Sequence, residues 1–82
     1  MKISEAEFVV KLNQANIYSS IVENEMLEYL NGFKRGLRSN FHNIDYHHDY
    51  LEAKDSVYAQ GYRDAYSGLD LDLTKFNEEE HD

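Results

Sequence analysis

The sequence predicts an all-α fold: a small three-helix domain built on an antiparallel helical hairpin, with an acidic C-terminal tail. The 82 residues hold no proline and only four glycines, whereas a β-rich chain of this size usually marks its turns with more of both. Two segments open on Ser-x-x-Glu, the pattern that satisfies free amides at a helix start. Apolar residues then recur at helical spacing. We expect residues 1–82 to form one domain.

The first helix is predicted over about residues 5–14. Ser4 and Glu7 supply its capping pattern. Its apolar face is expected to hold Phe8, Val9 and Leu12. The helix should end near the asparagines at positions 13 and 16. Because a helix of about ten residues is marginal on its own, it must dock on the rest of the chain.

The second helix is predicted over about residues 21–38, with Ser20 and Glu23 as its capping pattern. Its apolar stripe has spacings of four, four, three and four residues and consists of Val22, Met26, Leu30, Phe33 and Leu37. Cations in the last turns offset the negative end of the helix dipole. These cations are Lys34, Arg35 and Arg38.

A polar loop over residues 39–48 should lead into a third helix over about residues 49–67. Gly68 is its expected left-handed C-cap. The inward face of this helix is expected to hold Leu51, Tyr58, Gly61, Tyr62 and Ala65. In the tail, residues 69–82, the first part with its leucines and Phe76 should pack or form a short extended piece, and the last five residues should fray.

Small residues four apart predict close packing between the second and third helices. Gly32 and Gly36 share one helix face, as do Gly61 and Ala65 on the other helix. A glycine inside a helix costs about 1 kcal/mol relative to alanine, so we expect a structural reason for these glycines. Close approach of the two backbones supplies one, with Phe33 packed at the crossing.

Charge, hydropathy and cysteine content argue against non-specific nucleic-acid binding and against a membrane-spanning protein. Sixteen acidic against eight basic residues give a formal charge of −8 and a pI near 4.8, which argues against non-specific nucleic-acid binding. Residues 1–30 carry two cations and five carboxylates, residues 31–63 five and four, and residues 64–82 one and seven. The acid therefore lies at the two ends. No apolar run reaches the roughly 20 residues of a membrane span, and the absence of cysteine suits a cytoplasmic protein.

The sequence has no pattern typical of catalysis, so we expect no enzyme, no cofactor and no small-molecule substrate. It lacks a nucleophile elbow and a phosphate-binding loop. The residues of metal-ligating type share one loop and are His42, Asp45, His47, His48 and Asp49. A zinc site usually draws its ligands from two elements at defined spacing, so a solvated loop is the expectation and metal binding the alternative.

The glycine-aromatic segments resemble the ribosome modulation factor family and its small phage-encoded relatives, over about residues 31–67. The matching residues are Gly32, Phe33, Gly36, Tyr50, Tyr58, Gly61, Tyr62, Arg63 and Ala65. The resemblance implies two helices joined by an extended loop and, in the ribosome-binding members, a surface for ribosomal RNA. This chain lacks the family's proline before the loop tyrosine and is acidic where the RNA-binding members are basic.

The first of two function classes is a small acidic, phage-like interaction protein that inhibits or modulates a host nucleic-acid-processing or defence machine. Its carboxylates would act as a nucleic-acid mimic in a cationic groove of a host protein or protein–nucleic acid complex. The expected contacts are Glu23, Glu25, Glu28, Asp70, Asp72, Glu78, Glu79 and Glu80, with Tyr58, Tyr62 and Tyr66 as anchors. Carboxylates that serve only solubility, and tyrosines at the core edge, remain the alternatives.

The second class is a ribosome-associated modulator. Its contacts to RNA phosphates would be Lys34, Arg35, Arg38 and Arg63. The acidic balance of the chain favours the first class. A homodimer is a further alternative, because a small core with surplus tyrosines gains from self-association.

Overall fold

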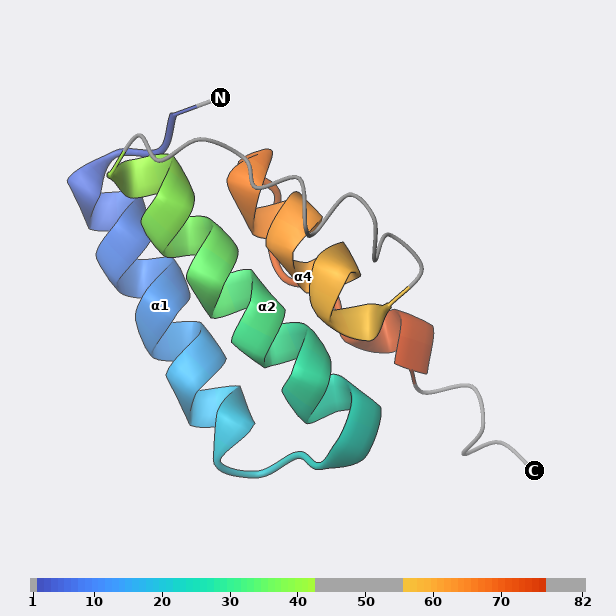
Figure 1. Cartoon of the computed structure of the whole chain (residues 1–82). Coiled ribbons are helices and arrows are strands. Elements are labelled where there is room, and N and C mark those ends of the chain that lie inside the picture. Colours follow the sequence, from blue (N-terminus) through green and yellow to red (C-terminus); the bar gives the residue numbers. More distant parts are fainter. Residues whose placement is uncertain (1, 43–55, 77–82) are drawn as a thin grey trace.

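The computed structural model describes residues 2–42 and 56–76. These residues form three α-helices and a short 3-10 helix: α1 (Glu5–Ser19), α2 (Asn24–Phe41), α4 (Val57–Tyr66) and η1 (Thr74–Phe76). Helix α2 lies between α1 and α4 (Figure 1). The described residues contain no strand, which confirms the predicted all-α class.

Helix α1 begins at the predicted cap and runs beyond its predicted end. The Glu7 amide donates to Ser4 Oγ at 3.1 Å, and the Ser4 amide donates to Glu7 Oε1 at 3.2 Å, which confirms the first capping pattern. The helix continues to Ser19. It does so because Ala15 is fully buried and Asn16 Oδ1 accepts from Lys34 Nζ at 3.2 Å instead of competing with its own backbone.

The predicted helix start at Ser20, with Glu23 as its capping partner, is wrong. Ser20 ends α1, and its hydroxyl donates to the Ile17 carbonyl at 2.7 Å. Helix α2 starts at Asn24, and Glu23 at its N-cap makes no side-chain capping bond within the described residues. The predicted stripe is nevertheless correct in its centre, because Leu30, Phe33 and Leu37 are fully buried. The helix extends to Phe41, so the first residues of the predicted loop are helical.

Helices α1 and α2 are antiparallel, and their contacts define the register. Phe8 near the start of α1 stacks on Phe41 at the end of α2, with ring centroids 4.5 Å apart. At this end the Ile3 amide donates to Asn40 Oδ1 at 2.9 Å, and Asn40 Nδ2 donates to the Tyr66 carbonyl at 2.9 Å. Asn40 therefore ties the N-terminal segment, α2 and α4 together.

Helices α2 and α4 are parallel, which corrects the predicted antiparallel pairing of the second and third helices. Gly32 meets the backbone of Tyr58, and four residues on Gly36 meets that of Tyr62. The prediction assumed a helix from position 49, directly after a short loop. Helix α4 starts at Val57, and positions 49–55 lie outside the described residues. The connection of 15 residues between Phe41 and Val57 can span about 50 Å, more than the about 27 Å length of α2, so the chain is long enough to return to the start of α2 and run parallel to it.

The glycines lie where the two helix backbones approach each other. A Cβ on Gly32 would overlap the Tyr58 carbonyl oxygen and lie 2.8 Å from its carbon. A Cβ on Gly61 would overlap the Tyr29 carbonyl oxygen and lie 2.8 Å from the Phe33 nitrogen. Real Cβ atoms do not approach backbone this closely, so neither position has room for a side chain.

Helix α4 is capped at both ends. The Ser56 hydroxyl accepts from the Ala59 amide at 3.0 Å. At the C-terminus Gly68 has a φ of 87°, as predicted. Its amide donates to Ala65 O at 3.0 Å, and the next amide donates to Asp64 O at 2.9 Å, which is the bond pair of a Schellman motif.

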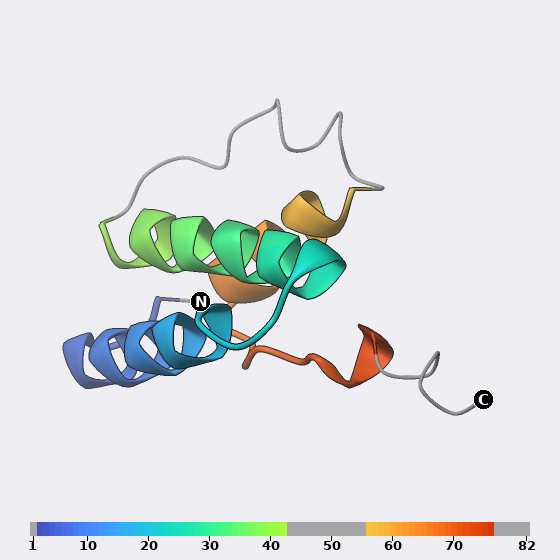
Figure 2. The ribbon, with the colours of Figure 1, turned by 90° about the horizontal axis from the view of Figure 1, so that it is seen from below.

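After Gly68, residues 69–73 run as an irregular segment beside α1, below α2 (Figure 2). We call residues 69–74 the C-terminal strap. Leu71 and Leu73 pack on the core, and Phe76 is buried against Tyr29 with ring centroids 5.4 Å apart. The predicted packing of the tail leucines holds for these two, whereas Leu69 is 57% exposed. The last five residues lie outside the described part.

Within residues 2–42 and 56–76, no helix combines the length and the apolar character that crossing a membrane requires.

Candidate interaction groove

Helix α1 has two apolar faces, and only one of them belongs to the core. Phe8, Leu12 and Ala15 pack toward α2. On the opposite side, Val10, Ile17, Tyr18 and Ile21 are exposed by 60, 63, 37 and 69%. Val10, Gln14 and Ile17 have the four-three spacing of one face of α1, and Ile21 follows four residues on, just beyond the C-cap residue Ser20. We call Val10, Gln14, Ile17 and Ile21 the outer stripe. The sequence-based assignment of Val9 to the core face is wrong, because Val9 is 48% exposed.

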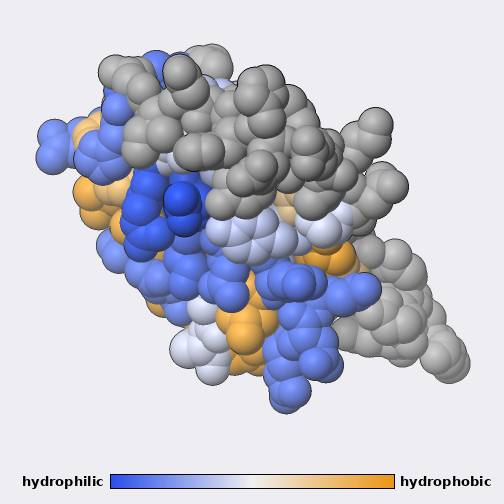
Figure 3. Space-filling model, viewed as in Figure 1, coloured by the Kyte–Doolittle hydropathy of each residue, from blue (hydrophilic) through white to orange (hydrophobic). Residues whose placement is uncertain are grey.

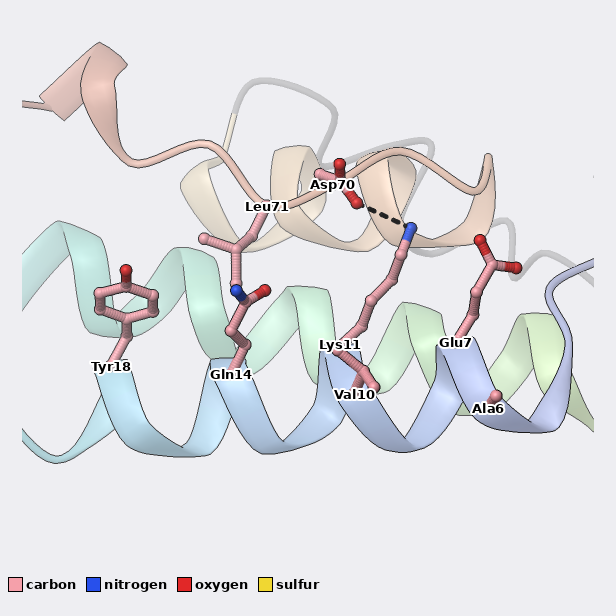
Figure 4. A pocket seen from close by; sticks show the side chains of 8 residues that line it. All are labelled: Ala6, Glu7, Val10, Lys11, Gln14, Tyr18, Asp70 and Leu71. Carbon is pink, nitrogen blue, oxygen red and sulfur yellow. Dashed lines mark ion pairs between the residues drawn. The ribbon is translucent and has the colours of Figure 1, made fainter.

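Val10, Gln14 and Ile21 of the outer stripe line a groove between α1 and the strap, of which Figure 4 shows the part around Val10 and Gln14. One hollow of about 600 Å³ is lined by Ala6, Glu7, Val10, Lys11, Gln14, Tyr18, Asp70 and Leu71. A second hollow of about 440 Å³ is lined by Tyr18, Ile21, Val22, Met26, Leu71, Asp72, Leu73 and Thr74. The hollows share Tyr18 and Leu71, so they meet in one groove that follows α1 for most of its length.

Lys11 holds the strap against α1. Its side chain reaches from α1 to the strap (Figure 4), and the residue is only 8% exposed. Nζ donates to the Gly68 carbonyl at 3.1 Å and to the Leu69 carbonyl at 3.4 Å, and it lies 3.1 Å from Asp70 Oδ1 (Figure 4). The cation therefore satisfies carbonyl groups just beyond the end of α4. It fixes the place where the strap leaves that helix.

Tyr29 anchors the middle of the strap to the helices. Its hydroxyl donates to Asp64 Oδ2 of α4 at 2.6 Å and accepts from the Asp72 amide at 3.2 Å. Burial, and then the hydrogen bond to Asp64, raise the pKa of Tyr29 far above its usual range. The tyrosine thus acts as a neutral donor between α2, α4 and the strap.

The rim of the groove is acidic. Glu7 lines it at the N-terminal end of α1, and Asp70 and Asp72 line it on the strap; all three are exposed. The cation among the lining residues, Lys11, is buried and paired with Asp70. A ligand in the groove would therefore meet an apolar floor between carboxylates.

The carboxylates predicted to bind a partner divide between two places. Asp70 and Asp72 line the groove. Glu23, Glu25 and Glu28 are exposed near the start of α2, where the last two border a separate hollow with Asn24, Leu27 and Asn31. Glu78, Glu79 and Glu80 lie outside the described residues.

The predicted ridge of Tyr58, Tyr62 and Tyr66 is not an exposed row. Tyr62 is fully buried, and its hydroxyl donates to Ser39 Oγ at 2.9 Å. The Tyr66 ring stacks on the Tyr62 ring at 5.8 Å, and both Tyr58 and Tyr66 are half-buried. Tyr62 therefore belongs to the α2–α4 interface, which corrects the expectation that it anchors a partner.

The four cations predicted to bind RNA differ in their surroundings. Arg35 and Arg38 are exposed, one helical turn apart on α2. Lys34 donates to Asn16, as described above. Arg63 on α4 is half-buried, and its Nη1 is buried without a hydrogen-bond partner in the described part of the chain. The face seen in Figure 3 is mainly hydrophilic, with apolar side chains in separate spots.

The predicted loop of metal-ligating residue types is represented by His42 alone, because positions 45–49 lie outside the described residues. His42 is exposed and packs edge-on against the rings of Phe8 and Phe41. In the described ranges no three His, Asp or Glu side chains gather in a way that could hold a metal ion.

No family model, curated protein or solved structure matches the chain. The resemblance to the ribosome modulation factor family stays a prediction.

The groove was not predicted from the sequence, although its signal is present there. Val10, Ile17 and Ile21 keep helical spacing on the face opposite Phe8 and Leu12. Because the helix is predicted to end at the asparagines, Ile17 and Ile21 fall outside it and the second stripe is not recognised.

Proposed function

We propose that the chain is a small acidic, non-catalytic interaction protein that inhibits or modulates a host machine for nucleic-acid processing or defence. The observation that carries this proposal is the outer stripe and the groove it borders. Exposed large apolar side chains that gather on one face mark interaction sites, whereas single exposed ones are ordinary. The fold itself does not need them, because the core uses the opposite face of α1.

The charges support a partner with a cationic surface. The exposed carboxylates at the groove and at the start of α2 would steer such a partner and speed its association at low salt. Proteins that handle nucleic acid carry cationic grooves of this kind. Apolar contact in the groove would then supply the affinity, and the surrounding carboxylates the selectivity.

The test is affinity capture from a bacterial lysate divided into ribosomal and post-ribosomal fractions. The double variant Val10→Ser/Ile21→Ser removes two stripe residues that line the groove, and Val9→Ser is its control, because Val9 is exposed on another side of α1 and does not line the groove. We expect one nucleic-acid-handling protein in the post-ribosomal fraction, retained by Val9→Ser and lost in the double variant. Equal capture by all variants would contradict the proposal.

Exposed Arg35 and Arg38 on α2 favour the second candidate, a ribosome-associated modulator. It predicts that the chain sediments with ribosomes and that Arg35→Glu/Arg38→Glu releases it, because each lost phosphate contact weakens RNA binding. Sedimentation with ribosomes that the stripe variants leave unchanged would decide for this candidate and against the first.

A further inference from the structure

We infer that the groove binds a basic amphipathic helix of the partner, with its apolar face on the outer stripe and its lysines or arginines toward the acidic rim. This inference rests on the proposed function and names the chemistry of the partner element.

The shape of the groove suits a helix. From Ala6 to Tyr18 the lining residues of α1 extend over about 18 Å, or about three helical turns, and Ile21 continues the groove just beyond the end of the helix. The stripe positions recur every three or four residues, so a partner helix that runs alongside α1 can place its own apolar residues between them. An extended peptide would need an exposed strand edge for its backbone, and the described residues contain no strand.

The carboxylates at the rim of the groove favour a positively charged helix as the ligand. Glu7, Asp70 and Asp72 flank the apolar floor, and buried Lys11 is already bonded to two carbonyls and to Asp70. An acidic helix would bring like charges together without a free cation among the lining residues to offset them. A basic helix would pair with the exposed carboxylates at the edges, where water still reaches them.

The same charges disfavour a second copy of this chain as the occupant. The chain carries a formal charge of −8, so two copies repel each other as they approach. An α1–α1 pair would also add the exposed carboxylates of Glu5 and Glu7 from both copies, while Lys11 stays buried in each. A partner of opposite charge avoids both effects.

Three fluorescent synthetic peptides of about 18 residues test the inference with the full-length chain. The first carries a leucine stripe at helical spacing with lysines elsewhere. The second replaces its lysines with glutamates, and the third scrambles the first so that composition and charge stay and the stripe is lost. Fluorescence anisotropy should show binding of the first peptide at least about tenfold tighter than of the other two, a difference of about 1.4 kcal/mol.

Matched variants locate the site. Val10→Ser/Ile21→Ser, which changes one residue in each hollow, should weaken binding of the basic amphipathic peptide about tenfold or more, whereas Val9→Ser should leave it unchanged. Asp70→Asn should weaken it a few-fold and reduce its salt dependence, whereas Glu28→Gln, exposed and away from the groove, should not. Circular dichroism checks that each variant keeps its helical content. NMR shift changes should fall on the outer side of α1 and on the strap.

The outcomes separate this inference from the proposed function. Equal binding of the scrambled peptide, or binding of none of the three, overturns the basic-helix inference. If the chain alone forms a dimer and the Val10→Ser/Ile21→Ser variant abolishes that dimer, the inference is overturned in favour of a second copy. In each of these cases the proposed function still stands or falls with the capture experiment, because that experiment depends on the stripe and not on the form of the partner.

Discussion

The Tyr29 hydroxyl and the Asp64 carboxylate lie 2.6 Å apart in a hydrogen bond between α2 and α4. The same hydroxyl accepts the Asp72 amide of the strap at 3.2 Å. One side chain therefore fixes three segments that are distant in sequence, and the strap wall of the groove depends on it.

Tyr29→Phe should lower the free energy of unfolding by about 1–3 kcal/mol, because Asp64 loses a donor and the Asp72 amide loses an acceptor in a partly buried place. Urea denaturation measures the change. Tyr18→Phe is the control, since Tyr18 lies at the surface, and it should change stability by less than about 0.5 kcal/mol. Equal effects of the two substitutions would contradict the assigned role of Tyr29.

The raised pKa of Tyr29 predicts a loss of stability at alkaline pH. In the unfolded chain a tyrosine ionises near pH 10, whereas burial and the bond to Asp64 keep Tyr29 protonated to higher pH in the folded chain. Its contribution is therefore complete below about pH 10 and is lost as the pH rises through the folded pKa. The stability of Tyr29→Phe should fall less steeply above pH 10 than that of the wild type, as measured by denaturation at several pH values.

Gly61→Ala should destabilise the fold by about 1–3 kcal/mol although alanine is the better helix former. The new Cβ would meet the Tyr29 carbonyl and the Phe33 nitrogen, which are backbone atoms and cannot rotate away. Thermal unfolding monitored by circular dichroism measures the effect. Asn31→Ala, exposed on α2, should be neutral or slightly stabilising. A more stable Gly61→Ala variant would show that the two helices can separate there without loss.

Lys11→Met should loosen the strap while the helices stay folded. The substitution keeps much of the apolar stem but removes the donor to the Gly68 and Leu69 carbonyls and the cation beside Asp70. We expect about 1–3 kcal/mol less stability and faster hydrogen exchange at the Asp72 amide. Lys34→Met, which removes the bond to Asn16, is the control and should leave the exchange of that amide unchanged.

The parts of the fold that could be predicted depend on neighbours in sequence. The Ser4–Glu7 cap, the buried centre of the α2 stripe and the left-handed Gly68 all follow from residues within one or two helical turns. Ser20 shows where such reasoning stops. Ser20 and Glu23 form the Ser-x-x-Glu pattern of a helix start. However, α1 extends up to Ser20, whose hydroxyl donates to the Ile17 carbonyl and so caps the C-terminal end of that helix.

The direction of α4 and the groove could not be predicted, because both depend on contacts between distant segments. Glycines four apart indicate that two helices touch, but they fit a parallel and an antiparallel pair equally well. Lys11 is a surface residue by its type, and only the carbonyls of residues 68 and 69 explain its burial. The candidate site could therefore be predicted in part: Asp70 and Asp72 by charge, and the stripe only once the length of α1 is known.

The parallel course of α2 and α4 has an electrical consequence. The dipoles of two antiparallel helices largely cancel, whereas those of α2 and α4 add along one direction, and their negative ends lie at the same end of the molecule. At that end Lys2 donates to the Phe41 carbonyl, Lys11 bonds the carbonyls after α4, and Arg38 and Arg63 lie in the last turns. At the other end, Glu23 and Glu25 lie at the positive start of α2. The α2–α4 pair is therefore polarised along its length, although α1, which is antiparallel to α2, offsets part of this field. The charged side chains at both ends of α2 counter the field of its backbone.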